Sequence, residues 1–144
     1  MPITEKDHEL IQALSQNARM SISDLARQLK VSRTTVKHRL ARLEETGVIA
    51  GYGLRLGEAY RGSSLQAYVN LKVQPRDGAR LAADLKKIPQ IEALFSVSGK
   101  FDMVLLVRTA TPAQLDELLD RIGVLEGVLG TESAIVLSSK FDRR

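Results

Sequence analysis

Residues 21–49 read SISDLARQLKVSRTTVKHRLARLEETGVI, and this stretch decides the fold of the first part of the chain. Its apolar residues recur at three- and four-residue spacing in two groups, which places each group on one face of a helix. Ser21 and Ser32 stand where helix N-caps belong, and Gly47 follows the second group as a stop. The stretch therefore predicts two short amphipathic helices joined by a tight turn, the pattern of a DNA-reading helix-turn-helix. The apolar residues are Ile22, Leu25, Ala26 and Leu29, then Val36, Leu40 and Leu43.

The charge of this stretch is one-sided. Between Leu25 and Leu43 there are six basic residues and no Asp or Glu, and such a surface attracts polyanions. Lys, Arg and Thr side chains on the second helix suit phosphates, guanine edges and thymine methyl groups, and Arg33 and Arg39 suit backbone phosphates. The alternative is an ordinary solvated helix face; cap, turn, periodicity and charge together favour DNA reading. The predicted DNA-binding residues are Ser32, Arg33, Thr34, Thr35, Lys37, His38, Arg39 and Arg42.

The composition excludes several kinds of chemistry. The 144 residues carry a net charge of +4, of which +3 falls in residues 1–62 and +1 in residues 63–144. There is no cysteine, which excludes disulfides, thiolate metal sites and a cysteine nucleophile. The only histidines are His8 and His38, so we expect no metal site, no cofactor and no catalytic residues. No apolar run approaches the roughly 18 residues of a membrane span and no signal segment is present, which predicts a cytoplasmic protein without membrane contact.

The remainder of the first half predicts a third helix and a domain boundary. Residues 4–15 have helical spacing, with Thr4 as N-cap and Asp7 as its capping partner. This helix would brace the other two. Residues 48–56 alternate weakly and predict a short strand or wing, and the glycines and serines of residues 57–64 predict a linker. We therefore expect a winged helix-turn-helix domain over residues 1–56, then the linker, then a second domain over residues 65–144.

The second domain combines strand and helix periodicities. Its apolar pattern alternates in residues 65–73, 91–98 and 128–138, is nearly continuous in residues 103–107, and has helical spacing after Asp77 and after Thr111. The order predicts a ferredoxin-like βαββαβ fold of the α+β class, with one antiparallel sheet and both helices on one face. By alternation, we expect the other face to be an apolar subunit interface. Its predicted residues are Tyr68, Leu94, Leu129, Ile135 and Leu137.

Short motifs run through both domains: Asp24-Leu25-Ala26, Val31-Ser32, Val36, Arg39-Leu40, Arg42-Leu43-Glu44, Gly47-Val48-Ile49, Gly51-Tyr52, Gly99-Lys100-Phe101-Asp102 and Gly127-Val128. Together they resemble the Lrp/AsnC family of transcription regulators, also called feast/famine regulators, over essentially the whole chain. The resemblance implies partners: double-stranded DNA, a homodimer formed sheet to sheet, and a ring of dimers such as an octamer. It also implies that an amino acid binds between subunits as an effector.

The resemblance implies particular effector-binding residues. The family's Gly-x-x-Asp turn falls on Gly99 and Asp102, where a carboxylate suits the α-amino group of an amino acid; the alternative is a plain hairpin turn, since both residue types form turns. Thr131 and Ser133 match polar positions that suit the effector's carboxylate, or else they are strand-surface hydroxyls. With the variable pair of the turn included, the predicted residues are Gly99, Lys100, Phe101, Asp102, Thr131 and Ser133.

One position departs from the family pattern. The residue before Val31 is usually glycine in the family and is Lys30 here. We expect Lys30 to have a left-handed backbone conformation, at a cost of about 1 kcal/mol relative to glycine.

The sequence thus predicts a sequence-specific DNA-binding transcriptional regulator that responds to an amino acid and is not an enzyme. Two alternatives are open. One is an enzyme similar to the sirohaem decarboxylases, which share this architecture; residues 39–144 contain no His or Cys for such chemistry. The other is an architectural protein that binds DNA without sequence preference.

Overall fold

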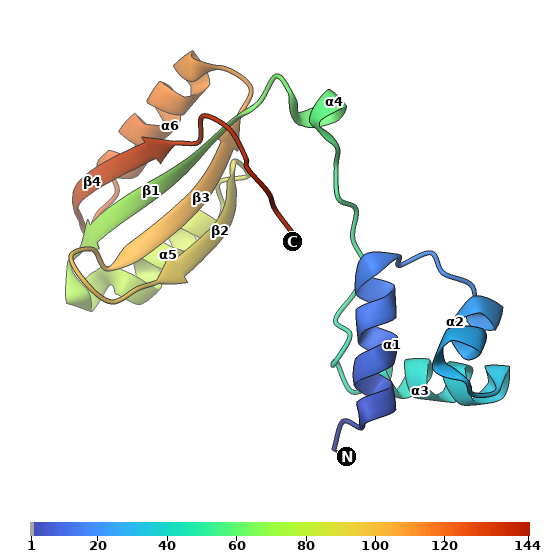
Figure 1. The fold of residues 1–144 in the computed structure, drawn as a ribbon. Helices are drawn as coiled ribbons and strands as arrows, with labels where there is room; N and C mark the ends of the chain where they lie inside the picture. The colour runs from blue at the N-terminus through green and yellow to red at the C-terminus, as the bar shows by residue number, and fades with distance from the viewer. Residues whose placement is uncertain (1) are drawn as a thin grey trace. The chain divides into compact units, whose positions relative to one another are not determined.

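The computed structural model describes residues 2–144 and divides the chain into two compact units, Met1–Arg55 and Leu56–Arg144 (Figure 1). The first unit contains the helices α1 (Glu5–Gln16), α2 (Ile22–Leu29) and α3 (Arg33–Glu45). Their apolar stripes meet in one core, as the helical spacing predicts. The buried residues of this core are Leu10, Ala13, Leu14, Leu25, Ala26, Leu29, Val36 and Leu43.

The helix ends of the first unit have the predicted caps. The Thr4 hydroxyl accepts from the Asp7 amide, and the Asp7 carboxylate accepts from the Thr4 amide in return, forming a capping box. The Ser21 and Ser32 hydroxyls accept from the Asp24 and Thr35 amides and so cap α2 and α3. Lys30 ends α2 with φ 57° and ψ 45°, so the predicted left-handed conformation is confirmed. These caps fix where α3 begins, and hence which of its side chains point away from the core.

The predicted wing is not a strand. Residues 48–57 have no regular secondary structure, because an isolated strand has no partner for its backbone and Gly51 and Gly53 weaken its extended conformation. The side chains of Tyr52 and Leu54 in this segment are exposed. Helix α4 (Glu58–Arg61) follows within the segment predicted as a linker.

The second unit is an antiparallel sheet with two helices on one face (Figure 1). The strand order is β2-β3-β1-β4, and every neighbouring pair is antiparallel. The chain order β-α-β-β-α-β confirms the predicted fold class. The elements are β1 (Leu65–Val73), η1 (Pro75–Asp77), α5 (Gly78–Lys86), β2 (Ile91–Ser96), β3 (Met103–Thr109), α6 (Pro112–Gly123) and β4 (Val128–Ile135).

The sheet face opposite the helices differs from the predicted one. Leu94 pairs with Leu105, and Ile135 pairs with Ala67. Because directly paired residues point to the same face and Leu105 and Ala67 are buried in the core under the helices, Leu94 and Ile135 face the helices. Tyr68 does lie on the open face, as predicted, since its neighbours in β1 are buried against the helices.

Two irregularities in strand pairing explain why the predicted face of Leu94 and Ile135 is wrong. The register shifts in β2 between Ile91 and Ala93, and in β4 at Leu129, which pairs with no β1 residue. An extra residue in a strand inverts the alternation beyond it, so residues that follow change face. Phe95 consequently takes the open face in β2. β4 ends at Ile135, and Leu137 lies beyond the strand.

Candidate nucleic-acid interface and effector site

The predicted DNA surface lies along α3. Arg33, Thr34, Lys37 and His38 are exposed there, while Val36 is buried on the opposite side of the helix. Ser32 caps the helix by accepting from the Thr35 amide at 3.1 Å, and the Ser32 and Thr35 hydroxyls are 2.8 Å apart. The structure therefore brings these predicted residues together on one solvent-facing surface.

Two of the predicted residues have a different environment. Arg39 Nη1 donates to Asp7 Oδ1 at 3.0 Å, and Arg42 Nη2 donates to Asp7 Oδ2 at 2.5 Å. Only 25% of the Arg39 side chain and 24% of the Arg42 side chain are exposed. Arg42 is therefore less exposed than a helical wheel suggests, because the buried carboxylate of α1 attracts its guanidinium across the helix interface. A helical wheel of α3 alone contains no information about Asp7.

Asp7 is the centre of a network that joins α1 to α3. It is fully buried. Burial alone raises the pKa of a carboxyl group, but hydrogen bonds from the Thr4 amide and hydroxyl and from Arg39 and Arg42 outweigh it, so the pKa of Asp7 lies well below its ordinary value. Arg39 Nη1 also donates to Thr4 Oγ1 at 2.9 Å. Asp7 therefore stays ionised and holds both guanidinium groups in place.

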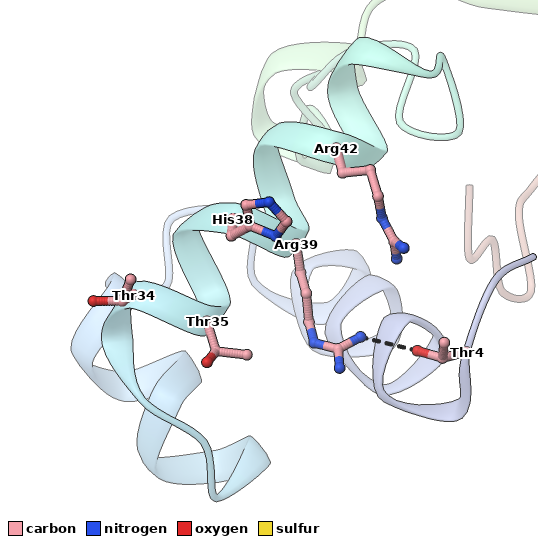
Figure 2. Close-up of a pocket in the computed structure, with 6 residues that line it drawn as sticks. All are labelled: Thr4, Thr34, Thr35, His38, Arg39 and Arg42. Carbon is pink, nitrogen blue, oxygen red and sulfur yellow. Dashed lines mark hydrogen bonds between the residues drawn. The ribbon is translucent and has the colours of Figure 1, made fainter. Parts of the chain in front are cut away.

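An open hollow of about 420 Å³ lies beside this network, between the start of α1 and the exposed side of α3. Figure 2 shows the Arg39 and Arg42 side chains extending from α3 toward Thr4, the residue that caps α1, and marks the hydrogen bond between Arg39 and Thr4. Sequence reasoning identified Thr4 and Asp7 only as capping residues and missed their place beside the DNA surface. The residues that line the hollow are Thr4, Thr34, Thr35, His38, Arg39 and Arg42.

The predicted effector turn is a tightly anchored connection between β2 and β3. Gly99 has φ 115°, a conformation that favours glycine. The Asp102 amide donates to the Leu71 carbonyl at 2.9 Å, and Asp102 Oδ2 accepts from the Val73 amide at 2.8 Å. The same oxygen lies 3.8 Å from Lys72 Nζ, and 42% of the Asp102 side chain is exposed. The carboxylate thus holds the turn to β1 and remains accessible.

Of the other residues in this turn, Gly99 and Lys100 are exposed and Phe101 is half-buried. Lys100 and Phe101 occupy the turn, with the Lys100 ammonium 5.5 Å from the Phe101 ring centroid. Lys72, which sequence reasoning missed, donates to the Lys100 carbonyl at 3.3 Å. The alternating pattern of β1 predicts only that Lys72 is exposed, and does not predict its contact with the turn.

Thr131 and Ser133 lie on the far side of β1 from this turn. They pair with Leu71 and Val69 and are exposed, because β4 is an edge strand. Since β1 stands between β4 and Asp102, the backbones of the two halves of the predicted site are separated by two strand spacings, roughly 10 Å.

Residues 2–144 contain neither a cluster of metal ligands nor a membrane-spanning helix. No group of three or more His, Asp or Glu side chains in that range is able to hold a metal ion. Every helix there is too short or too polar to traverse a lipid bilayer.

A basic, exposed helix after a tight turn, combined with a ferredoxin-like domain, defines a two-domain DNA-binding regulator of the helix-turn-helix class. The family model described as the Lrp/AsnC ligand binding domain matches residues 66–144, and the winged helix-turn-helix DNA-binding model matches residues 3–50. The chain belongs to the Lrp/AsnC family of transcription regulators.

Individual relatives agree with this assignment. The chain is 34% identical over 139 residues to the HTH-type transcriptional regulator LrpA of Mycobacterium tuberculosis, covering 96% of this chain and 92% of LrpA. It is 29% identical to the HTH-type transcriptional regulator FL11 of Pyrococcus horikoshii, with the same two coverages, 96% and 92%. Like these relatives, it is a DNA-binding transcriptional regulator.

Solved structures match the whole chain. A feast or famine regulatory protein from M. tuberculosis, complexed with L-methionine, has a TM-score of 0.88 at 33% identity, covering 99% of this chain and 97% of that one. AsnC of E. coli has a TM-score of 0.89 at 22% identity, covering 100% and 98%, and shares the fold.

Proposed function

We propose that this regulator reads a specific DNA sequence with α3 and responds to an amino acid bound at subunit interfaces of its second unit. The proposal assigns DNA binding to residues 1–56 and effector binding and assembly to residues 65–144, joined by residues 57–64. The protein acts in the cytoplasm as a homodimer or a ring of dimers such as an octamer, and catalyses no reaction. The observation that carries the proposal is the exposed polar and basic surface of α3 on a helix-turn-helix scaffold.

DNA recognition follows from the environment of the α3 side chains. The exposed Arg33 and Lys37 side chains are available for phosphates or guanine edges, and the exposed Thr34 for phosphates or a thymine methyl group. In a dimer, two such helices enter the major groove at half-sites roughly one helical turn or a multiple apart. The phosphate contacts supply most of the affinity, so binding weakens steeply with salt.

Effector recognition uses the turn at Gly99–Asp102 and the start of β4. Asp102 receives the α-amino group, and Thr131 or Ser133 receives the carboxylate. Because the backbones that carry these groups are two strand spacings apart, roughly 10 Å, an amino acid that contacts both kinds of group lies across β1, and a second chain supplies further contacts to it. The L-methionine bound to the M. tuberculosis relative supports an amino acid as the ligand class. The effector acts as a switch by binding two assemblies, or two helix spacings, with different affinity.

The test is an effector screen in a DNA-binding assay. Fluorescence anisotropy of a labelled duplex from upstream of the protein's own gene gives the DNA affinity with each of the twenty amino acids present. We expect at least one amino acid to change the affinity about fivefold or more. Asp102→Asn, which keeps an oxygen acceptor for the Val73 amide but loses the negative charge, should weaken that response strongly. An affinity that no amino acid changes would contradict the effector part of the proposal.

A further inference from the structure

Two guanidinium groups and one carboxylate meet beside the hollow along α3. The guanidinium groups of Arg39 and Arg42 share the single carboxylate of Asp7. The lowered pKa of Asp7 keeps that carboxylate ionised at neutral pH, so the three groups together carry one net positive charge. The charge stands at an opening to solvent, because about a quarter of each arginine side chain is exposed.

The lining of the hollow is rich in hydrogen-bond donors and has no carboxylate. Its six lining residues carry hydroxyl, imidazole and guanidinium groups beside their apolar atoms, and these groups are donors that bind phosphate oxygens. Arg39 Nε is the one buried side-chain nitrogen or oxygen within residues 2–144 that lacks a hydrogen-bond partner, so the donor capacity of Arg39 is not exhausted by Asp7 and Thr4.

The hollow is continuous with the DNA-reading surface. Thr34 and His38 are exposed on α3 and line the hollow as well, whereas Thr4 reaches it from the start of α1 (Figure 2). When α3 lies in the major groove, the backbone that borders the groove passes along one flank of the helix. A backbone phosphate is therefore an anion that this position meets.

We propose that the hollow seats one backbone phosphate of DNA and that Asp7 is the residue that positions Arg39 and Arg42 for it. The inference rests on the proposed function, because it requires α3 to bind DNA. It adds α1 to the interface and gives its buried carboxylate a role in binding. Asp7 does not touch the DNA; it fixes two long side chains before binding, which reduces the ordering cost that flexible arginines incur on association.

The first test removes one charge from the hollow and measures the salt dependence of binding. Arg39→Gln keeps an amide donor for Asp7 and loses the charge; Arg121→Gln, on exposed α6 surface of the second unit, is the control with the same charge loss. Anisotropy is measured across a salt series with the own-gene duplex and with a shuffled duplex. For Arg39→Gln, the slope of log K against log[salt] should become less steep by about 0.9. Between 1 M and 0.1 M salt, the affinity of this variant should therefore rise about eightfold less than that of the wild type. Arg121→Gln should leave the slope unchanged.

The second test asks whether Asp7 acts by placing the Arg39 and Arg42 side chains or only through its negative charge. Asp7→Asn makes the hollow more positive, so an effect of charge alone would tighten DNA binding, whereas loss of positioning weakens it. Asp7→Glu keeps the charge and shifts the carboxylate by one methylene, and should also weaken binding. Hydrogen exchange of α1 and α3 amides identifies conditions under which each variant is folded.

These tests of the phosphate seat can be interpreted whether or not the protein binds a specific DNA sequence. A folded Arg39→Gln variant with the wild-type salt slope on both duplexes, or tighter binding by Asp7→Asn, would overturn the phosphate seat. Equal wild-type affinity for the own-gene and shuffled duplexes would instead contradict the proposed sequence-specific function, and the slope comparison would still decide the seat.

Discussion

A single buried carboxylate connects the stability of the first unit to its surface chemistry. Asp7 is buried at the junction of α1 and α3, where an ionised group is tolerated only because four donors compensate for lost water. Two of these donors belong to its own capping box with Thr4. The capping box was predictable from the spacing of Thr4 and Asp7, but the ion pairs with α3 were not, since they join residues more than thirty positions apart.

The pKa of Asp7 predicts how stability changes with pH. The folded-state pKa lies below the unfolded value of about 3.9, so the stabilisation is fully present above about pH 5 and is lost as pH falls through the folded-state pKa. Hydrogen exchange of the α1 and α3 amides, measured in urea at several pH values between 7 and 2, should show this loss of stability. Asp7→Asn should be less stable at neutral pH and have a flatter acid profile. Parallel profiles for both proteins would mean that Asp7 is not the group responsible.

Lys30 tests the cost of the tight turn. Its left-handed backbone conformation strains any residue that has a Cβ atom. Lys30→Gly should therefore raise the free energy of unfolding by up to about 1 kcal/mol. The matched control Lys30→Ala removes the same charge but keeps the Cβ, and should not produce this gain. If both variants were equally stabilised, the cause would be charge and not backbone strain.

At the level of elements, local signals were sufficient for the helices and insufficient for the sheet faces. The caps Thr4, Ser21 and Ser32 and the apolar stripes lie within single segments, so they could be predicted from spacing. The strands themselves were also predictable from alternation. The faces of β2 and β4 were not, because the irregularities after Ile91 and at Leu129 depend on pairing with strands distant in sequence.

Neighbouring residues of β2 provide a test of the observed register. Leu94 packs against the helix-covered core, whereas Phe95 is 54% exposed on the open face. Leu94→Ala should lower the free energy of unfolding by about 1–2 kcal/mol at every protein concentration. Phe95→Ala should act through assembly, so its effect should grow where the wild type is oligomeric and vanish at high dilution. Chemical unfolding at two concentrations, with sedimentation to follow assembly, distinguishes them; reversed behaviour would contradict the register.

At the scale of the whole molecule, the two functional units could be predicted from the sequence, but the arrangement of the effector site could not. The exposed residues of α3 were predictable, because one helix supplies both the buried stripe and the opposite surface. The effector residues are divided between a turn and an edge strand with β1 between them. A pattern along one chain contains no information on what a second chain adds at such a site.

The central claim is that this protein reads DNA sequence through α3. The most direct measurement is fluorescence anisotropy with the duplex from upstream of its own gene, against a shuffled duplex of the same composition, at about 0.15 M salt. We predict roughly a thousandfold or greater preference for the own-gene duplex, and weaker binding to both duplexes by Lys37→Ala, which removes an exposed charge from α3. Equal affinity of the wild type for the two duplexes would contradict sequence reading. Wild-type affinity in both single variants, Lys37→Ala and Arg33→Ala, would contradict the role of α3.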